Sequence, residues 1–224
     1  MNVLPLPRRP YPSEEFLYTV CWRWSRALAS YLSHTRVHFS ERIPKTGPLL
    51  VAANHSSFLD PVYVGAVLTR PTRYMAKDTL FRGPFGTFLR ALGAFPVRRG
   101  KADAGAIRTA MRVLKAGDAL VMFPEGTRGA AMDADIRDAQ KGVGFLATRM
   151  NATVLPVYVH GLGEVLGRGQ RWFRRGQVDI VFGEPRDYAR DHDPGDVATE
   201  VVQEIARLRA SFGSLELDRS LRVG

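Results

Sequence analysis

Three things are scarce in this sequence: cysteine, long uncharged apolar runs, and acidic residues relative to basic ones. Cys21 is the single cysteine among 224 residues, which excludes an intrachain disulfide framework and a cysteine-based zinc site. A reducing, cytoplasmic setting is the natural expectation. The uncharged run 46–59 contains Asn, His and two Ser, and it is shorter than the roughly 20 apolar residues of a membrane-spanning helix. We therefore expect no transmembrane segment, and we expect no secretory signal because Pro and Glu follow Arg8 and Arg9.

The charge balance is strongly basic, with 32 Lys and Arg against 22 Asp and Glu and a formal net charge of +10. Such a surface prefers anionic partners: nucleic acid, phosphorylated substrates or the acidic face of a membrane. A basic module that binds nucleic acid or an anionic membrane is the non-enzyme alternative. The sequence contains no recognised nucleic-acid motif, no Gly-x-Ser-x-Gly motif of serine hydrolases and no His-Glu-x-x-His motif. We expect neither nucleic acid as a partner nor a metal.

Segments of strand and helix pattern alternate along the chain. The apolar spacing predicts an amphipathic helix over 16–32, which meets either the membrane or the core, and a helix from Asp60 to residue 68. The predicted strands are 49–54, 74–77, 119–123, 153–160 and 178–182, and further helices lie near 103–117, 138–150 and after 197. This alternation predicts an α/β fold whose central sheet is mixed, largely parallel and flanked by helices. We expect the segment 1–34 to carry the amphipathic helix and 35–224 to form the enzymatic domain.

The motif NHSSFLD, residues 54–60, follows a predicted buried strand and holds His55 and Asp60. On a straight helix these side chains would point about 140° apart, but a strand–turn–helix corner brings them together. A carboxylate then keeps the imidazole in one tautomer, and the ring can take a proton from a substrate hydroxyl. The plainer alternative makes Asp60 a helix N-cap, worth about 1 kcal/mol, and His55 a hydrogen-bonded loop residue.

A second motif, FPEGTRG at 123–129, also follows a predicted buried strand. Ligands of open α/β sheets lie beyond the carboxyl ends of the strands. Glu125 can hold a hydroxyl or a cation there, and Arg128 can clamp a phosphate. The alternative is a tight turn with a surface Glu–Arg pair, which contributes about 0–1 kcal/mol.

Two further stretches mix basic and aromatic residues. Residues 70–101 contain eight basic residues, including Lys77, and the single acid Asp78, with Phe and Leu interleaved. This mixture suits an anionic head group with an apolar tail, or else a solvated basic face over ordinary core residues. The stretch 167–176 contains four Arg around a Trp and a Phe, so it is either a loop that contacts anionic lipid or an exposed loop without a specific partner.

Four short blocks, in this order, resemble the glycerolipid acyltransferase family and in particular its 1-acylglycerol-3-phosphate O-acyltransferases. They are NHSSFLD with its His and Asp, GAFPVRR at 93–99, FPEGTR at 123–128 and VLPV at 154–157. The resemblance covers roughly residues 37–185 and implies the glycerol-3-phosphate acyltransferase-like fold. The chain departs from the family at Arg98, where relatives often carry an acidic residue.

The resemblance implies roles for the matched residues. His55 is expected to be the general base on the acceptor hydroxyl, and Asp60 its orienting partner. Arg99 is expected to bind the glycerol phosphate. The other residues expected at the substrate are Lys77, Glu125, Gly126, Thr127 and Arg128.

The expected reaction moves a fatty acyl group from acyl-coenzyme A or acyl-carrier protein to the free hydroxyl of 1-acylglycerol 3-phosphate, giving phosphatidic acid. It uses no protein nucleophile, no cofactor and no metal. Alternative acceptors are another lysophospholipid or glycerol 3-phosphate itself. The expected partners are these substrates, an anionic membrane surface and acyl carrier protein. We expect the protein in the cytoplasm, peripherally associated with the inner face of the cell membrane.

Overall fold

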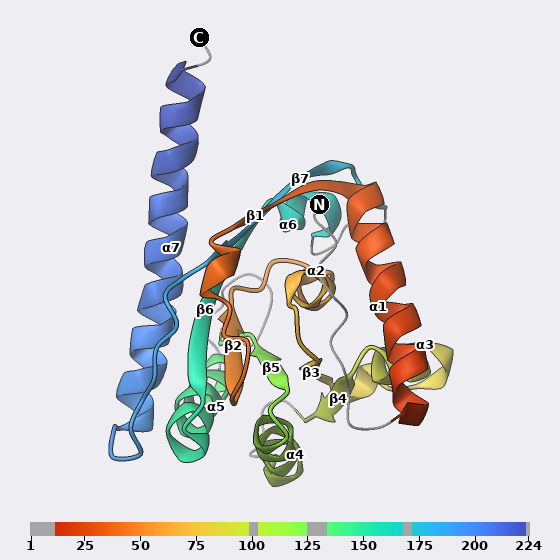
Figure 1. Cartoon of the computed structure of the whole chain (residues 1–224), viewed down its shortest axis with the longest axis vertical. Coiled ribbons are helices and arrows are strands. Elements are labelled where there is room, and N and C mark those ends of the chain that lie inside the picture. The colour runs from red at the N-terminus through yellow and green to blue at the C-terminus, as the bar shows by residue number, and fades with distance from the viewer. Residues whose placement is uncertain (1–11, 99–102, 125–133, 168–171, 223–224) are drawn as a thin grey trace.

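The computed structural model describes residues 12–98, 103–124, 134–167 and 172–222 (Figure 1). The helices are α1 Pro12–Leu32, α2 Asp60–Val67, α3 Gly83–Ala91, α4 Ala104–Lys115, α5 Ala134–Met150, α6 Leu162–Leu166 and α7 Pro194–Arg222. The strands are β1 Ser33–His38, β2 Leu49–Ala53, β3 Thr72–Lys77, β4 Ala94–Val97, β5 Ala119–Met122, β6 Thr153–His160 and β7 Gly176–Phe182. Two short 3₁₀ turns, Ser40–Arg42 and Asp78–Leu80, complete these elements.

A seven-stranded sheet forms the centre of the fold, in the order β1-β7-β6-β2-β5-β3-β4. Neighbouring strands run parallel except β6 and β7, which are antiparallel. The expected mixed, largely parallel sheet is therefore confirmed. β2 lies at its middle, and all of its residues are buried. A strand buried on both faces has a continuous apolar sequence, which is why β2, β5 and β6 were predictable.

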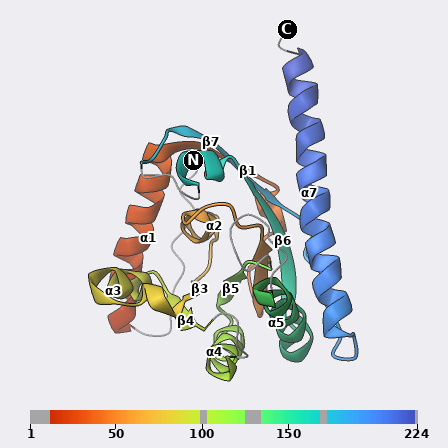
Figure 2. The same ribbon diagram turned by 180° about the vertical axis from the view of Figure 1, so that it is seen from behind.

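Helices cover both faces of this sheet, as Figures 1 and 2 show from opposite sides. Leu49, Val51 and Ala53 of β2 face a core built with α1, α2 and α6, whereas Leu50 and Ala52 face one built with α4, α5 and α7. This division follows from the alternation of side chains along a strand. The sheet is thus shielded on both sides, and its carboxyl edge is where polar residues gather.

Helix α1 has two different apolar faces. Trp22, Ala29 and Leu32 are buried, and the Trp22 indole donates a hydrogen bond to the Gly65 carbonyl of α2 at 3.2 Å. Phe16, Trp24 and Tyr31, which belong to the apolar stripe that predicted this helix, are exposed. One face of the helix therefore packs against the protein, and the other is open to solvent. Within the described ranges, no helix has the length and apolar character needed to cross a membrane.

Four elements have no counterpart in the sequence prediction: β1, α3, β4 and α6. The two strands are the edges of the sheet, where one side of the strand has no neighbour to bury it. β1 reads SHTRVH and β4 reads AFPV. β1 is mostly polar and β4 is four residues long with a proline, and polar residues and proline are typical of edge strands.

Candidate active site

The first motif forms a corner at the carboxyl end of the central strand. β2 ends at Ala53, residues 54–59 make a loop, and α2 begins at Asp60. Nδ1 of His55 lies 2.7 Å from Oδ2 of Asp60. The predicted contact between the two side chains is confirmed. The Asp60 side chain is fully buried and that of His55 is 9% exposed, so the pair lies in a largely water-excluded place, where hydrogen bonds are strengthened.

The alternative reading of Asp60 as a helix N-cap is wrong. Leu59 occupies the N-cap position, and no side chain caps α2. The Asp60 carboxylate instead turns back onto the loop, where Oδ2 accepts hydrogen bonds from the backbone N–H groups of Ser56 at 2.6 Å and Ser57 at 2.8 Å. Because these amides belong to the segment that carries His55, the carboxylate fixes the shape of that loop as well as the histidine ring.

The loop is also attached to neighbouring elements. The Asn54 side chain makes two hydrogen bonds with the backbone of Val159 in β6, donating to its carbonyl at 2.9 Å and accepting from its N–H at 2.7 Å. The buried Ser57 hydroxyl donates to the Leu166 carbonyl of α6 at 2.5 Å. The sequence did not predict these roles: polar residues flank His55 there, but the local pattern does not identify their partners. Together they hold the His55 backbone from two sides.

Phe123 brings the third block to the histidine. Its ring stacks on the imidazole of His55, with centroids 4.3 Å apart and planes inclined by 23°. Phe123 follows β5, which pairs with β2, so the two motifs meet because their strands are neighbours in a parallel register. Phe123 belongs to the FPEGTRG motif, but the motif alone predicts no separate role for it.

The other predicted site residues are placed as follows. Lys77 ends β3, at the same edge of the sheet, and is exposed. Arg99, Glu125, Gly126, Thr127 and Arg128 lie outside the described residues. Within the described part of the chain, no group of three or more His, Cys, Asp or Glu side chains could hold a metal ion.

An apolar cavity of about 70 Å³ lies beside the loop, between α1, α2, α3 and β3. Phe58 from the loop and Pro61 from α2 line it on the side of the His55 loop. Trp22 of α1, Met75 of β3 and Leu89 of α3 line it elsewhere. The site therefore has an apolar compartment next to its polar pair.

Comparison with known proteins agrees with this geometry. The sequence model of the Acyltransferase family matches residues 34–160. The 1-acyl-sn-glycerol-3-phosphate acyltransferase of Bacillus subtilis (strain 168) is 28% identical over 171 residues, covering 75% of this chain and 82% of the relative. The enzyme of that name from Streptococcus pneumoniae (strain ATCC BAA-255 / R6) is 31% identical over 194 residues, covering 84% of this chain and 69% of the relative.

A solved structure shares the fold. The crystal structure of the 1-acyl-sn-glycerophosphate acyltransferase PlsC from Thermotoga maritima superposes with a TM-score of 0.71 at 24% identity, covering 92% of this chain and 83% of the other. The predicted fold and the resemblance read from the four sequence blocks are both confirmed. With more than half of its length matched by the family's own sequence model, this chain belongs to the acyltransferase family.

Proposed function

We propose that this protein transfers a fatty acyl group from an acyl thioester to the free hydroxyl of 1-acylglycerol 3-phosphate, producing phosphatidic acid. His55 acts as the general base and Asp60 orients it. One observation supports this most strongly. The His55–Asp60 pair, 2.7 Å apart, lies under the first residue of the FPEGTR block at the carboxyl edge of the sheet, where open α/β folds bind their ligands.

The proposed chemistry follows from the hydrogen bonds around Asp60. Its Oδ2 atom accepts from two backbone amides, which can only donate, so it also accepts the proton on Nδ1 of His55. The neutral imidazole then carries its lone pair on Nε2. Nε2 takes the proton of the acceptor hydroxyl as the oxygen attacks the thioester carbonyl. The C–O bond forms, the C–S bond breaks, and the thiolate leaves and receives the proton. Base catalysis of this kind is worth about 10²–10⁴ in rate.

The acceptor's phosphate is assigned to basic residues of the matched sequence blocks. In this proposal Arg99 and Arg128 bind it, Glu125, Gly126 and Thr127 line the acceptor site, and Lys77 contributes charge from the end of β3. Arginine suits phosphate because its guanidinium can donate two parallel hydrogen bonds. The cavity beside Phe58 and Pro61 offers an apolar wall for an alkyl chain.

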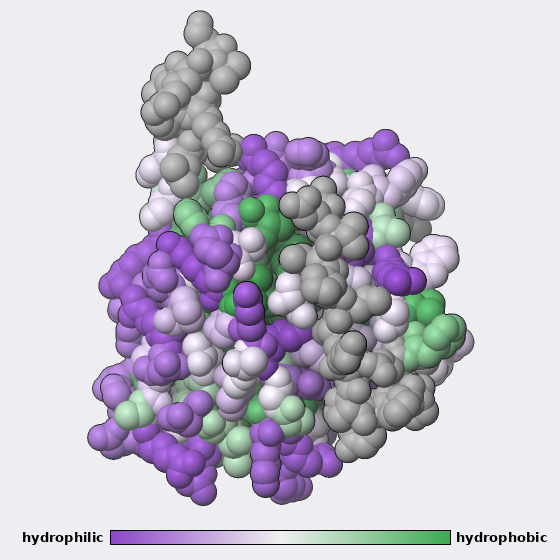
Figure 3. All heavy atoms as spheres, viewed as in Figure 1, coloured by the Kyte–Doolittle hydropathy of each residue, from purple (hydrophilic) through white to green (hydrophobic). Residues whose placement is uncertain are grey.

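The same proposal includes docking on an anionic membrane, which brings the enzyme to its lipid. Phe16, Trp24 and Tyr31 of α1 are 77%, 72% and 66% exposed. Figure 3 shows hydrophobic side chains at the surface on the side where α1 and α3 lie. The Arg175 guanidinium lies 4.3 Å from the centre of the Tyr31 ring. A basic residue of the stretch 167–176 therefore contacts an exposed aromatic residue of α1. A basic and aromatic surface suits the boundary between lipid head groups and acyl chains. The proposed location is the inner face of the cell membrane.

An assay matrix tests the proposal. The purified protein is offered 1-acylglycerol 3-phosphate, other lysophospholipids and glycerol 3-phosphate, each with acyl-coenzyme A or acyl-carrier protein as donor. We expect the fastest transfer to 1-acylglycerol 3-phosphate. Faster transfer to another acceptor would reassign the substrate. Tight nucleic-acid binding with no transfer from any donor would favour the non-enzyme alternative.

A further inference from the structure

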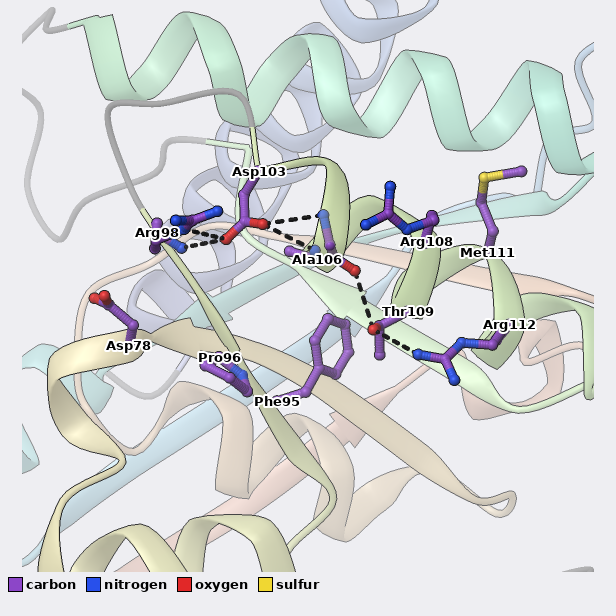
Figure 4. A pocket seen from close by; sticks show the side chains of 11 residues that line it. Asp78, Phe95, Pro96, Arg98, Asp103, Ala106, Arg108, Thr109, Met111 and Arg112 are labelled. Carbon is purple, nitrogen blue, oxygen red and sulfur yellow. Dashed lines mark hydrogen bonds and ion pairs between the residues drawn. The ribbon is translucent and has the colours of Figure 1, made fainter.

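A larger cavity, of about 780 Å³, lies between the edge strand β4 and helix α4 (Figure 4). Its lining combines two chemistries. Phe95, Pro96 and Met111 give it an apolar floor, while Arg98, Arg108 and Arg112 give it guanidinium groups. We call it the α4 pocket. None of its lining residues has a part in the reaction proposed above.

The charges in the α4 pocket favour an anion. Asp103 is already engaged, because its carboxylate accepts hydrogen bonds from Gly105 and Ala106 at the start of α4 and from the backbone and side chain of Arg98. The backbone N–H of Arg98, with that of Ala106 and the Arg98 side chain, lowers the pKa of Asp103 to about 2. The Asp78 carboxylate accepts from the N–H of Thr79 at 2.8 Å. Both acids thus have local hydrogen-bond donors.

Two of the arginines make no ion pair with an acidic side chain among the described residues. Arg112 donates to the neutral hydroxyl of Thr109 at 3.1 Å, and Arg108 makes no ion pair with any residue that the structure describes. Both side chains are exposed. They are four residues apart on α4 and therefore lie on one face, where like charges repel. An anion bound between them would relieve that repulsion.

The position of the α4 pocket limits what the anion can be. Arg98 follows β4 and Asp78 follows β3, so the pocket opens at the same carboxyl edge of the sheet as His55. β4 is the third strand from β2, which corresponds to about 15 Å at 4.7–4.9 Å per strand. A ligand that reaches both places is long, with a reacting carbonyl at one end and negative charge at the other.

Acyl-coenzyme A has this form, because a long pantetheine arm separates its thioester from a phosphorylated adenosine. We propose that the α4 pocket binds the adenosine 3′,5′-bisphosphate end of the acyl donor. The adenine lies on Phe95, and the phosphates meet Arg108 and Arg112. This inference rests on the proposed acyl transfer and adds a donor to it: coenzyme A rather than a carrier protein.

Binding of the isolated fragment is the first test. Adenosine 3′,5′-bisphosphate is titrated calorimetrically into the wild-type protein, the double variant Arg108→Ala/Arg112→Ala and the control Arg190→Ala, which removes one exposed arginine outside the pocket. Charge-assisted hydrogen bonds are the stronger kind, so we expect binding to weaken about tenfold or more in the double variant and to be unchanged in the control. No binding to the wild type, or equal binding to the double variant, would overturn the proposal.

Donor kinetics provide the second test. The double variant is compared with the wild type on acyl-coenzyme A and on an acyl-pantetheine thioester with the same chain but no nucleotide. We expect KM to rise about tenfold or more for acyl-coenzyme A and to stay unchanged for acyl-pantetheine. An equal rise for both donors, or no rise for acyl-coenzyme A, would contradict the assignment. Wild-type protein that transfers from no donor would instead defeat the proposed function, while the titration still tests the pocket.

Discussion

The aromatic ring of Phe123 lies flat against the imidazole of His55, 4.3 Å between centroids, and joins two motifs that are far apart in the sequence. The stack restricts rotation of the imidazole, and the contact with Asp60 fixes its Nδ1 atom. A ring held at two points presents its remaining nitrogen in one direction. Such positioning contributes to rate because small misplacements of a catalytic group slow a reaction strongly.

Replacing Phe123 by alanine removes the stack and leaves Asp60 in place. We expect kcat to fall about tenfold to a hundredfold, with little change in KM for either substrate. Phe123→Tyr keeps an aromatic ring against the imidazole and should retain most of the activity. Steady-state kinetics on both variants make the comparison. Full activity in Phe123→Ala would show that the stack does not matter for catalysis.

The substitution Asp60→Asn tests the orienting role. Asparagine keeps a carbonyl oxygen for Nδ1–H and for the two backbone N–H groups that share Oδ2, but it removes the negative charge that stabilises the imidazolium formed on proton transfer. We expect kcat to fall about 10²–10⁴-fold at pH values where the wild type is active. The thermal midpoint of each protein is measured alongside, because Asp60 also holds the backbone of Ser56 and Ser57. A folded variant with wild-type kcat would remove Asp60 from the mechanism.

Vesicle binding tests the exposed face of α1. The wild type should bind anionic vesicles, and binding should weaken as salt is raised because salt screens exposed charges. Trp24→Ser/Tyr31→Ser should lower the partition coefficient about a hundredfold or more, since burial of each large apolar side chain is worth about 1.5–3 kcal/mol. Phe145→Ser, an exposed position on α5, serves as the control. Binding that is insensitive to salt, or equal in all three proteins, would argue against this surface.

Asp179 makes the stability of the fold depend on pH. Burial raises the pKa of this carboxyl, but hydrogen bonds from Arg36, His38 and Gln177 outweigh burial and lower it to about 2. An unfolded aspartate titrates near 3.9. The stabilisation is therefore fully present above about pH 4 and is lost as the pH falls towards 2, to an extent on the order of 2 kcal/mol.

Denaturant unfolding at pH 5, 4 and 3 checks this expectation. The difference in unfolding free energy between the wild type and Asp179→Asn should shrink as the pH falls. Asp191→Asn, which changes an almost fully exposed carboxyl, should follow the wild type. A constant difference between wild type and Asp179→Asn across this range would contradict the assignment.

How much the sequence could predict depended on burial. β6 was predicted with its observed bounds, because its run of apolar residues is buried on both faces. β4 was missed, because it is a strand of four residues at the edge of the sheet, half the length of β6. For α1 the predicted length was nearly correct, but the sequence left open which face packs: the indole of Trp22 is buried while that of Trp24 is exposed, and spacing alone does not distinguish two apolar faces.

In the site, too, some contacts could be predicted from the local sequence and others could not. The meeting of His55 and Asp60 followed from a corner between strand and helix, which a local sequence can encode. The stack of Phe123 and the bonds from Asn54 to Val159 were not predictable, because they depend on which strands become neighbours of β2. Asp60 was assigned an N-cap alternative on good local grounds, yet its carboxylate serves the preceding loop. Tertiary contacts decided each of these cases.

The most direct test of the account is the rate of acyl transfer to 1-acylglycerol 3-phosphate by His55→Ala, beside His192→Ala, which changes an exposed histidine outside the site. Both proteins are first shown to keep the wild-type thermal midpoint to within a few degrees, as expected for substitutions that leave the core intact. We predict that His55→Ala loses at least about 10² of the wild-type kcat and that His192→Ala loses none. Wild-type turnover by folded His55→Ala would contradict the central claim.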